Sequence, residues 1–173
     1  MGSESSSEQV KDVYANFGLA IYHAQCLEHE LVNSLIFLDL IPNQRKFAKS
    51  SEDWTSRVEA FMESKFEFTL GKMIRALSEV TTVDPLMHQQ LSDALAKRNW
   101  LAHSYFRDRA ESFLSFSGRE SMLAELESIQ ETFCSADQAL EAAVKPARER
   151  AGLTDEALAE NYEKLRAKIV DDL

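Results

Sequence analysis

Hydrophobic residues recur through most of this chain at steps of three and four, which is the spacing of one face of an α-helix. The first such stripe runs from Val10 to Leu38 and contains one charged residue, Glu28. A stripe of this length is typical of a helix in a bundle, and Pro42-Asn43 predicts its end. The stripe consists of Val10, Tyr14, Phe17, Ile21, Ala24, Glu28, Leu31, Leu35 and Leu38.

Two more helices are predicted before residue 106. Ser50 or Ser51 is expected to cap the first of them, and Gly71 predicts a kink or a short break within it. Asp84-Pro85 predicts the start of the second helix, because Asp is a good N-cap and Pro fits the first helical position. The apolar face expected for this second helix consists of Met87, Leu91, Ala94, Arg98, Ala102 and Tyr105.

A further long helix is predicted after a less regular segment at residues 107–116. Ser117 and Glu120 have the spacing of a capping box, and Pro146 predicts an end or a kink. The stripe of this helix consists of Met122, Leu126, Ile129, Phe133, Ala136 and Leu140. A last helix is expected to start near Thr154, with Leu158, Tyr162, Leu165 and Ile169 on one face.

Together these patterns predict an all-α fold, an up-and-down antiparallel helical bundle of four main helices with a short C-terminal helix. Residues 1–7 are expected to form a disordered tail, residues 8–150 the bundle, and residues 151–173 the C-terminal helix. The chain has five Gly and three Pro in 173 residues. Such scarce turn residues argue against an all-β fold, which needs a turn every few residues.

The charge of the chain restricts its possible partners. The net charge of −10 counts against a general nucleic-acid binder, because phosphates repel an acidic surface. Residues 97–119 nevertheless hold five basic residues against two acids, a local balance of +3. A basic island on an acidic body suits a small anionic site, although solvated side chains at Arg107 and Arg109 explain the same pattern.

Other classes of protein are disfavoured by what the sequence lacks. It has no apolar run long enough to span a membrane and no secretory hydrophobic segment, so we expect a cytoplasmic protein without membrane contact. Cys26 and Cys134 lack the spacing of metal ligands or of a disulfide framework, and we interpret them as reduced core thiols. The carboxylates also lack ligand spacing, so neither a metal nor another cofactor is expected.

The strongest chemical signal is the segment Lys97–Phe106. An always-charged Arg needs an anion when it is removed from water, and a His moves protons near neutral pH. Arg98 for a phosphate and His103 for a proton are sufficient equipment for cutting RNA without a metal. With Asn99 and Tyr105 they resemble the R-N-x-x-x-H-x-Y motif of the HEPN family. That family has a helical-bundle fold, and many of its members are ribonucleases.

The resemblance implies a specific reaction. The 2′-hydroxyl of RNA attacks the adjacent phosphate, and His103 moves the proton as general base or acid. Arg98 stabilises the charge that develops on the phosphate oxygens, and Asn99 orients His103 or the phosphate. The flanking cations expected to bind RNA are Lys97, Arg107 and Arg109.

The geometry of an unbroken helix poses a difficulty for this reaction. Arg98 and His103 are five residues apart and therefore about 140° apart around the helix axis. They converge only if the helix distorts, if the long Arg side chain wraps across it, or if a second chain supplies one group. HEPN sites typically lie between two protomers, which implies a homodimer. The competing interpretation makes His103 a core histidine and pairs Arg98 with Asp93 or Glu28.

Two further residues have two interpretations each. Glu28 either reaches water after a small rotation of its helix, or supports the site by facing Arg98 or His103. Tyr105 occupies the position that a partner nucleotidyltransferase modifies in one HEPN branch. The plainer interpretation is that Tyr105 packs at the dimer interface or hydrogen-bonds RNA.

The sequence therefore predicts a metal-independent endoribonuclease of HEPN type, of the kind that serves as the toxin of a toxin–antitoxin or phage-defence system. Its expected partners are RNA, a second copy of the chain, and an antitoxin or nucleotidyltransferase. The alternative is a catalytically silent helical bundle that acts as a dimeric interaction module or as the partner of a nucleotidyltransferase. The first function requires Arg98 and His103 to converge on an open basic cleft, whereas the second allows acids to neutralise them.

Overall fold

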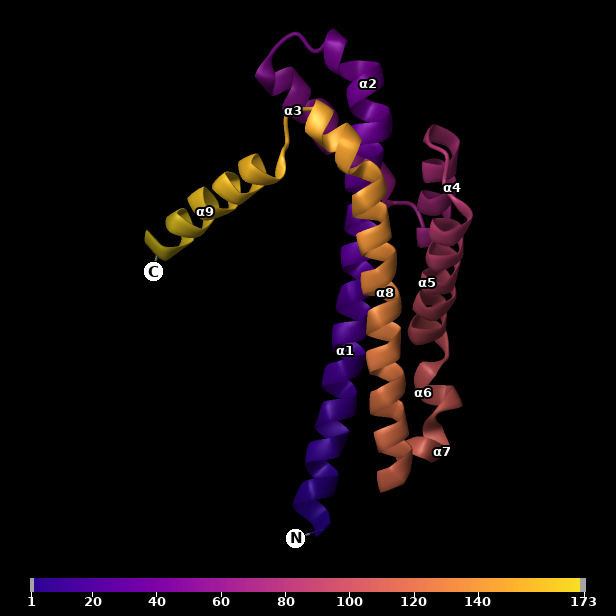
Figure 1. Cartoon of the computed structure of the whole chain (residues 1–173). Helices are drawn as coiled ribbons and strands as arrows, with labels where there is room; N and C mark the ends of the chain where they lie inside the picture. The colour runs from indigo at the N-terminus through magenta and orange to yellow at the C-terminus, as the bar shows by residue number, and fades with distance from the viewer. Residues whose placement is uncertain (1, 172–173) are drawn as a thin grey trace.

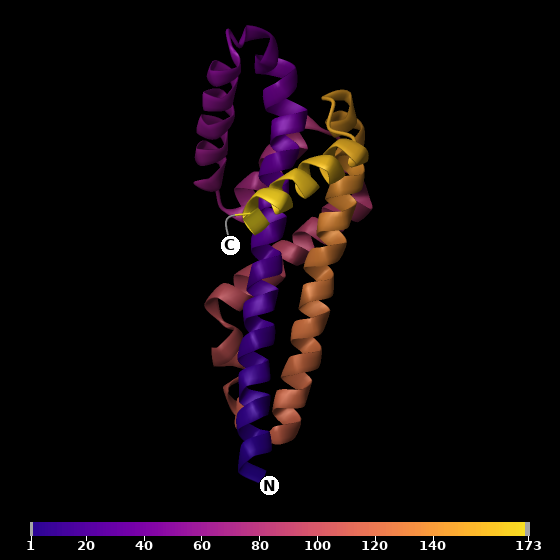
Figure 2. The ribbon, with the colours of Figure 1, turned by 90° about the vertical axis from the view of Figure 1, so that its left-hand side faces the viewer.

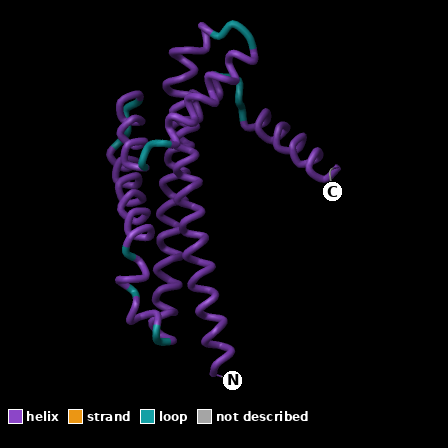
Figure 3. Tube along the Cα trace, turned by 180° about the vertical axis from the view of Figure 1, so that it is seen from behind, coloured by secondary structure: helices purple, strands orange, loops and turns teal. Residues whose placement is uncertain are grey.

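The computed structural model describes the backbone of residues 2–171 and the side chains of residues 7–169. Within this range the chain is helical, with short loops and no strand, which confirms the all-α class (Figures 1 and 3). Residue 1 of the predicted tail and residues 172–173 of the predicted C-terminal helix lie outside the described residues. Residues 2–7, also predicted as tail, form the first turns of the first helix.

The first α-helix stops before its predicted end at Pro42-Asn43, although the chain stays helical for a few residues beyond that point. Helix α1 (Gly2–Leu35) leads into a π-helical turn (Ile36–Leu40), helix α2 (Ile41–Gln44) and a 3₁₀ turn (Arg45–Phe47). Pro42 does not end the helical path, because it lies in the first turn of α2, where no intrahelical N–H is needed.

The middle of the chain contains three helices, where the sequence predicted two. Helix α3 (Ser51–Phe66) and helix α4 (Leu70–Val80) are separate, and helix α5 (Pro85–His103) carries the motif. Two predicted caps are confirmed. Ser50 accepts a hydrogen bond from the Asp53 amide at 3.1 Å, and Asp84 accepts from the next two free amides at 2.9 Å each. The break between α3 and α4 falls before Gly71, because Thr69 caps α4.

The last third of the chain holds the second long helix. Short helices α6 (Tyr105–Asp108) and α7 (Ala110–Phe113) precede helix α8 (Phe116–Arg150), and helix α9 (Asp155–Asp171) follows. The predicted capping box at Ser117 is wrong, since Ser115 caps α8 by accepting from the Gly118 amide. Gly118 is needed there, because an added Cβ would lie 2.1 Å from the Ser112 carbonyl oxygen. Pro146 neither ends α8 nor divides it, because the helix continues to Arg150.

The two long helices lie side by side and run parallel (Figure 1). Near their beginnings Gln9 donates a hydrogen bond to the Phe116 carbonyl, and further along Gln130 donates to the Asn16 carbonyl. The antiparallel arrangement predicted for all neighbouring helices therefore does not hold for this pair. The reason is the extra break before α4: the chain makes three helical passages between the long helices, and an odd number returns α8 in the direction of α1 (Figure 1).

The core lies where α1, α4, α5 and α8 meet. The stripe predicted for α8 is confirmed, with every member from Met122 to Leu140 at most 1% exposed. On α1 the predicted stripe is confirmed at Ala24, Leu31 and Leu35, whereas nearer the start of the helix the buried seam is rotated by about one position, so that Val13 is fully buried and Tyr14 is 54% exposed. Small residues on this seam, such as Ala20 and Ala24, allow α1 and α8 to pack closely.

The C-terminal helix stands apart from this core. Helix α9 leaves the end of α8 at a wide angle and crosses over α1 when viewed from the side (Figures 1 and 2). Its start is fixed by Arg148, which is 5% exposed and donates to Asp155 at 2.6 Å and to the Leu153 carbonyl at 2.8 Å. Within the described residues, no helix is long and apolar enough to span a bilayer.

Candidate functional site

Arg98 and Glu28 form an ion pair between α5 and α1. The Nε of Arg98 donates to an Oε of Glu28 at 3.1 Å, and the two side chains are 32% and 21% exposed. Both residues lie at the edge of the core, where Leu27 beside Glu28 is fully buried. Glu28 thus does not face water alone, and the contact expected between these two residues is confirmed. Both interpretations of Arg98 include this contact among their alternatives: in one Glu28 supports the site, and in the other Glu28 neutralises Arg98.

The pair leaves part of Arg98 free. In the part of the chain that the structure describes, neither terminal amino group of its guanidinium has a hydrogen-bond partner, since Glu28 takes only Nε. The contact with Glu28 therefore fixes the orientation of the planar guanidinium, and its two terminal amino groups remain available for an anion.

His103 is the last residue of α5 and is exposed. Among the described residues its imidazole has no hydrogen-bond or ion-pair partner, so His103 is not the core histidine of the competing interpretation. Asn99 lies one turn earlier on the same face of α5 and is also exposed. The two side chains therefore share an open surface.

Within one protomer Arg98 and His103 do not share a face of α5. The helix is continuous from Pro85 to His103, so the two residues remain about 140° apart around its axis. The distortion near Trp100 that would bring them together does not occur, because the Ser104 amide still donates to the Trp100 carbonyl at 2.9 Å.

Trp100 organises the basic island around it. Its indole N–H donates to Asp108 at 2.9 Å, and this bond, followed by that from Arg107, lowers the pKa of the Asp108 carboxyl below its usual range. Lys97 and Arg109 lie over the indole ring, 5.6 and 4.9 Å from its centroid. Cations over an aromatic face gain electrostatic energy, so the ring helps to hold each of these two side chains in place.

Acids from outside the motif neutralise part of this island. Arg109 forms two hydrogen bonds to the carboxylate of Glu125 on α8, at 2.8 and 2.6 Å, and these bonds raise the pKa of Arg109. Because Glu28 and Glu125 each contribute one negative charge, the local balance falls from +3 to +1. Arg107 pairs with the neighbouring Asp108, but its side chain is 74% exposed. It is therefore the most accessible of the three cations predicted to bind RNA.

Tyr105 is a core residue. Its side chain is 1% exposed, its hydroxyl donates to the Met122 carbonyl at 3.4 Å, and its ring lies 5.0 Å from that of Trp100. Burial raises the pKa of its phenol well above the usual value. Modification by a partner, contact with RNA and packing at a dimer interface all need an accessible side chain, whereas Tyr105 packs inside the protomer.

The sequence pattern did not reveal several contacts. Glu125 lies outside the motif, and nothing in its spacing marks it as the partner of Arg109. Cys134 on α8, interpreted from the sequence as a reduced core thiol, lies 3.6 Å from a ring nitrogen of His23 on α1. Among the described residues, no group of three or more His, Cys, Asp or Glu side chains is arranged to hold a metal ion.

Compared with known proteins, the chain matches no family model, no curated protein and no solved structure. The resemblance to the HEPN family therefore rests on the motif residues of α5 and on the helical fold.

Proposed function

We propose that this protein is a metal-independent endoribonuclease of HEPN type, in which two protomers supply Arg98 and His103 to one site. The observation that carries the proposal is the state of Arg98. Glu28 fixes its Nε while both terminal amino groups stay free, and the side chain is partly exposed. A guanidinium held in this way can bind two oxygens of a phosphate with a smaller loss of side-chain conformational entropy than a freely rotating one.

The proposed reaction is an internal transfer. His103 removes the proton from the 2′-hydroxyl of RNA, and the resulting oxygen attacks the adjacent phosphorus. The bond to the 5′-oxygen of the next nucleotide breaks, and that oxygen takes a proton from an imidazolium. Arg98 stabilises the extra negative charge on the phosphate in the transition state. The products are a 2′,3′-cyclic phosphate and a 5′-hydroxyl.

The need for a second protomer follows from the continuous helix. Because Arg98 and His103 of one chain point about 140° apart, a two-fold axis near α5 is the simplest way to bring an Arg of one copy to the His of the other. In this proposal the four-helix up-and-down bundle expected of the family corresponds to α1, α4, α5 and α8, with the direction of α8 reversed. The biological role would be that of a toxin controlled by the product of a neighbouring gene.

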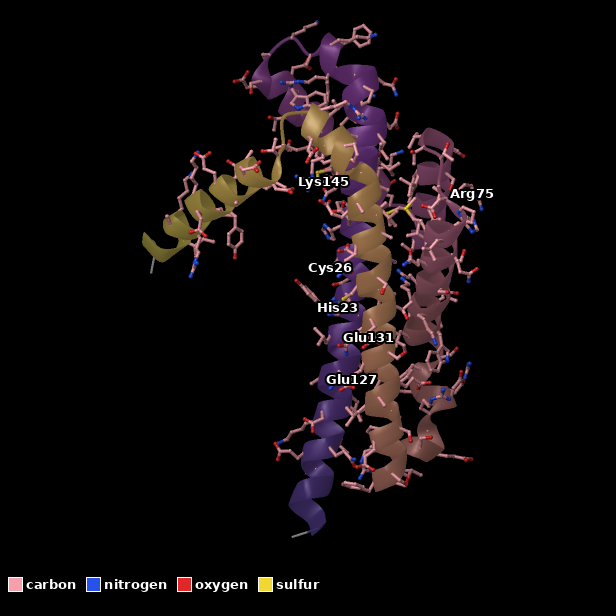
Figure 4. The ribbon with its side chains drawn as sticks, viewed as in Figure 1. His23, Cys26, Arg75, Glu127, Glu131 and Lys145 are labelled. Atoms are coloured by element: carbon pink, nitrogen blue, oxygen red, sulfur yellow. The ribbon has the colours of Figure 1, made fainter. Side chains whose placement is uncertain are left out.

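The test is cleavage of single-stranded RNA by the purified protein in excess chelator. We expect cyclic-phosphate ends, and we expect Arg98→Ala and His103→Ala each to lower the rate at least ~100-fold, as for loss of a general base or a charge-stabilising group. The matched controls are Arg75→Ala and His88→Ala, which remove an exposed Arg and an exposed His from the same region of the fold (Arg75 is labelled in Figure 4). Equal activity of all four variants would refute the proposal.

A mixing experiment tests the shared site. If each site combines Arg98 of one protomer with His103 of the other, equal amounts of the two inactive variants should form dimers with one intact site. We expect about a quarter of wild-type activity after random reassembly, because half of the dimers are mixed and each has one of two sites. A mixture as inactive as its components would show that both groups act within one chain or not at all.

The second candidate is a silent interaction module, and the neutralised basic island favours it. Glu28 and Glu125 reduce the local charge, and two cavities of about 310 and 410 Å³ are lined by residues other than Arg98 and His103. If RNA is not cleaved while sedimentation shows a stable dimer, this function replaces the first. Glu28→Gln also distinguishes the enzyme from the interaction module. In an enzyme this variant should lower the cleavage rate, whereas in an interaction module it should leave the affinity of the dimer unchanged.

A further inference from the structure

A seam of polar contacts joins α1 and α8, separate from the motif of α5. Gln130 donates to the Asn16 carbonyl and side-chain oxygen at 3.2 Å each, and further along the seam Cys134 meets His23. Figure 4 shows His23 and Cys26 on α1 beside α8, about midway along the pair. The core cluster is apolar, whereas this seam consists of half-buried polar and reactive side chains between the two long helices.

The Cys134 thiol has a specific partner. Its Sγ lies 3.6 Å from Nδ1 of His23, within hydrogen-bonding distance for sulfur, and both side chains are half-buried. Asp137 follows one turn later on α8 and is close enough for its charge and that of His23 to interact. Thiol and imidazole therefore form the direct pair that a nucleophile and its base require, with a carboxylate in the same neighbourhood.

We propose that Cys134 is a nucleophilic thiol, with His23 as its proton acceptor, and that it forms a mixed disulfide with the disulfide of a low-molecular-weight thiol. Cys134 and His23 are both half-buried rather than buried, so the sulfur remains accessible to a small reagent. This proposal is independent of RNA cleavage.

The reaction needs only the disulfide as co-reactant. In the tautomer with its proton on Nε2, His23 accepts the thiol proton at Nδ1. The thiolate attacks one sulfur of the incoming disulfide, the old sulfur–sulfur bond breaks, and a new one joins Cys134 to that half of the molecule. The other half leaves as a thiolate and takes the proton from the imidazolium. One disulfide is consumed and one is formed, so no further oxidant is required.

The chain provides its own control in Cys26. This thiol is also half-buried and also on the α1–α8 pair, but its neighbour is the phenol of Tyr22, whose pKa it raises. A phenol that keeps its proton at neutral pH cannot act as a base, so burial is comparable and the acceptor differs. The ratio of the two reaction rates therefore isolates the contribution of His23.

The experiment measures the reaction of the folded, full-length protein with the neutral reagent dithiodipyridine at neutral pH. Cys26→Ser reports Cys134 alone, and Cys134→Ser reports Cys26 alone. We expect Cys134 to react at least ~10-fold faster, and His23→Gln to remove most of that advantage, a smaller factor than the typical ~100-fold or more for a general base in an enzyme. Rates in denaturant should be equal. His29→Gln, an exposed His on the same helix, should leave both rates unchanged.

Each other result overturns the proposal. Equal rates, or a faster Cys26, would mean that His23 does not activate the thiol. A fast Cys134 that is unaffected by His23→Gln would owe its rate to exposure alone. If the only effect of His23→Gln were to loosen the packing between α1 and α8, both Cys134 and Cys26 would react faster in the variant. A rise in both rates would therefore also count against His23 as a base. In a second experiment, incubation with oxidised glutathione should add one glutathione to the wild-type protein, measured by intact-mass spectrometry. This adduct should be absent from the Cys134→Ser variant.

Discussion

Glu30 is expected to make the protein less stable as the pH rises through neutrality. It lies on α1 beside the end of α8, where it lines a cavity of about 270 Å³ with Glu141 and Arg148. The pKa of its carboxyl is raised to about 7, mainly by burial and to a smaller extent by the acids Glu141 and Asp137, while a hydrogen bond from Asn33 and the charge of Arg148 oppose the rise. The folded protein therefore holds this proton more tightly than the unfolded chain does.

The sign and the size follow from proton linkage. A carboxyl whose pKa rises from 4.5 to about 7 on folding stabilises the folded state fully below 4.5 and loses that contribution as the pH rises through 7. The difference corresponds to about 3 kcal/mol at most, and partial exposure makes about 2 kcal/mol the better expectation. Glu30→Gln keeps the shape and the contact to Asn33 but carries no charge, so the variant should not lose this stability.

The assay is urea unfolding followed by circular dichroism at about pH 5 and about pH 8, with the free energy of unfolding extrapolated to water. We expect Glu30→Gln and wild type to differ little at the lower pH, and the variant to be more stable by about 2 kcal/mol at the higher pH. Glu59→Gln, an exposed position on α3, is the control and should follow wild type at both. A Glu30→Gln variant with the wild-type pH dependence would refute the reasoning.

Three further predictions concern the fold. Gly118→Ala should destabilise the protein by about 1–3 kcal/mol in thermal unfolding, because the added methyl group would clash with the Ser112 carbonyl. Gly18→Ala should instead stabilise α1 by about 0.5–1 kcal/mol, because the space around Gly18 is open. Similar effects at both sites would contradict this prediction. Asp84→Ala should cost about 1 kcal/mol through the lost cap of α5, while Asp84→Asn should largely restore it. Tyr105→Phe should cost about 1 kcal/mol in urea unfolding and leave RNA cleavage unchanged; a loss of cleavage at full stability would assign the hydroxyl to the site.

The sequence by itself determined the features that depend on neighbours along the chain. The helical class, the caps at Ser50 and Asp84, and the buried stripe of α8 all follow from spacing, because a helix repeats every 3.6 residues and its ends need local partners. The composition of α5 also singled out Arg98 and His103 as chemical candidates. In each case the information lies within a few residues of the feature.

The tertiary structure alone decided which faces meet. The rotation of the first turns of α1 and the parallel course of α8 depend on packing against distant helices, which spacing along one helix cannot specify. The partners of charged and reactive groups depend on it too. Glu125 meets Arg109 across 16 residues and His23 meets Cys134 across 111, because the helices that carry them are brought together only by folding.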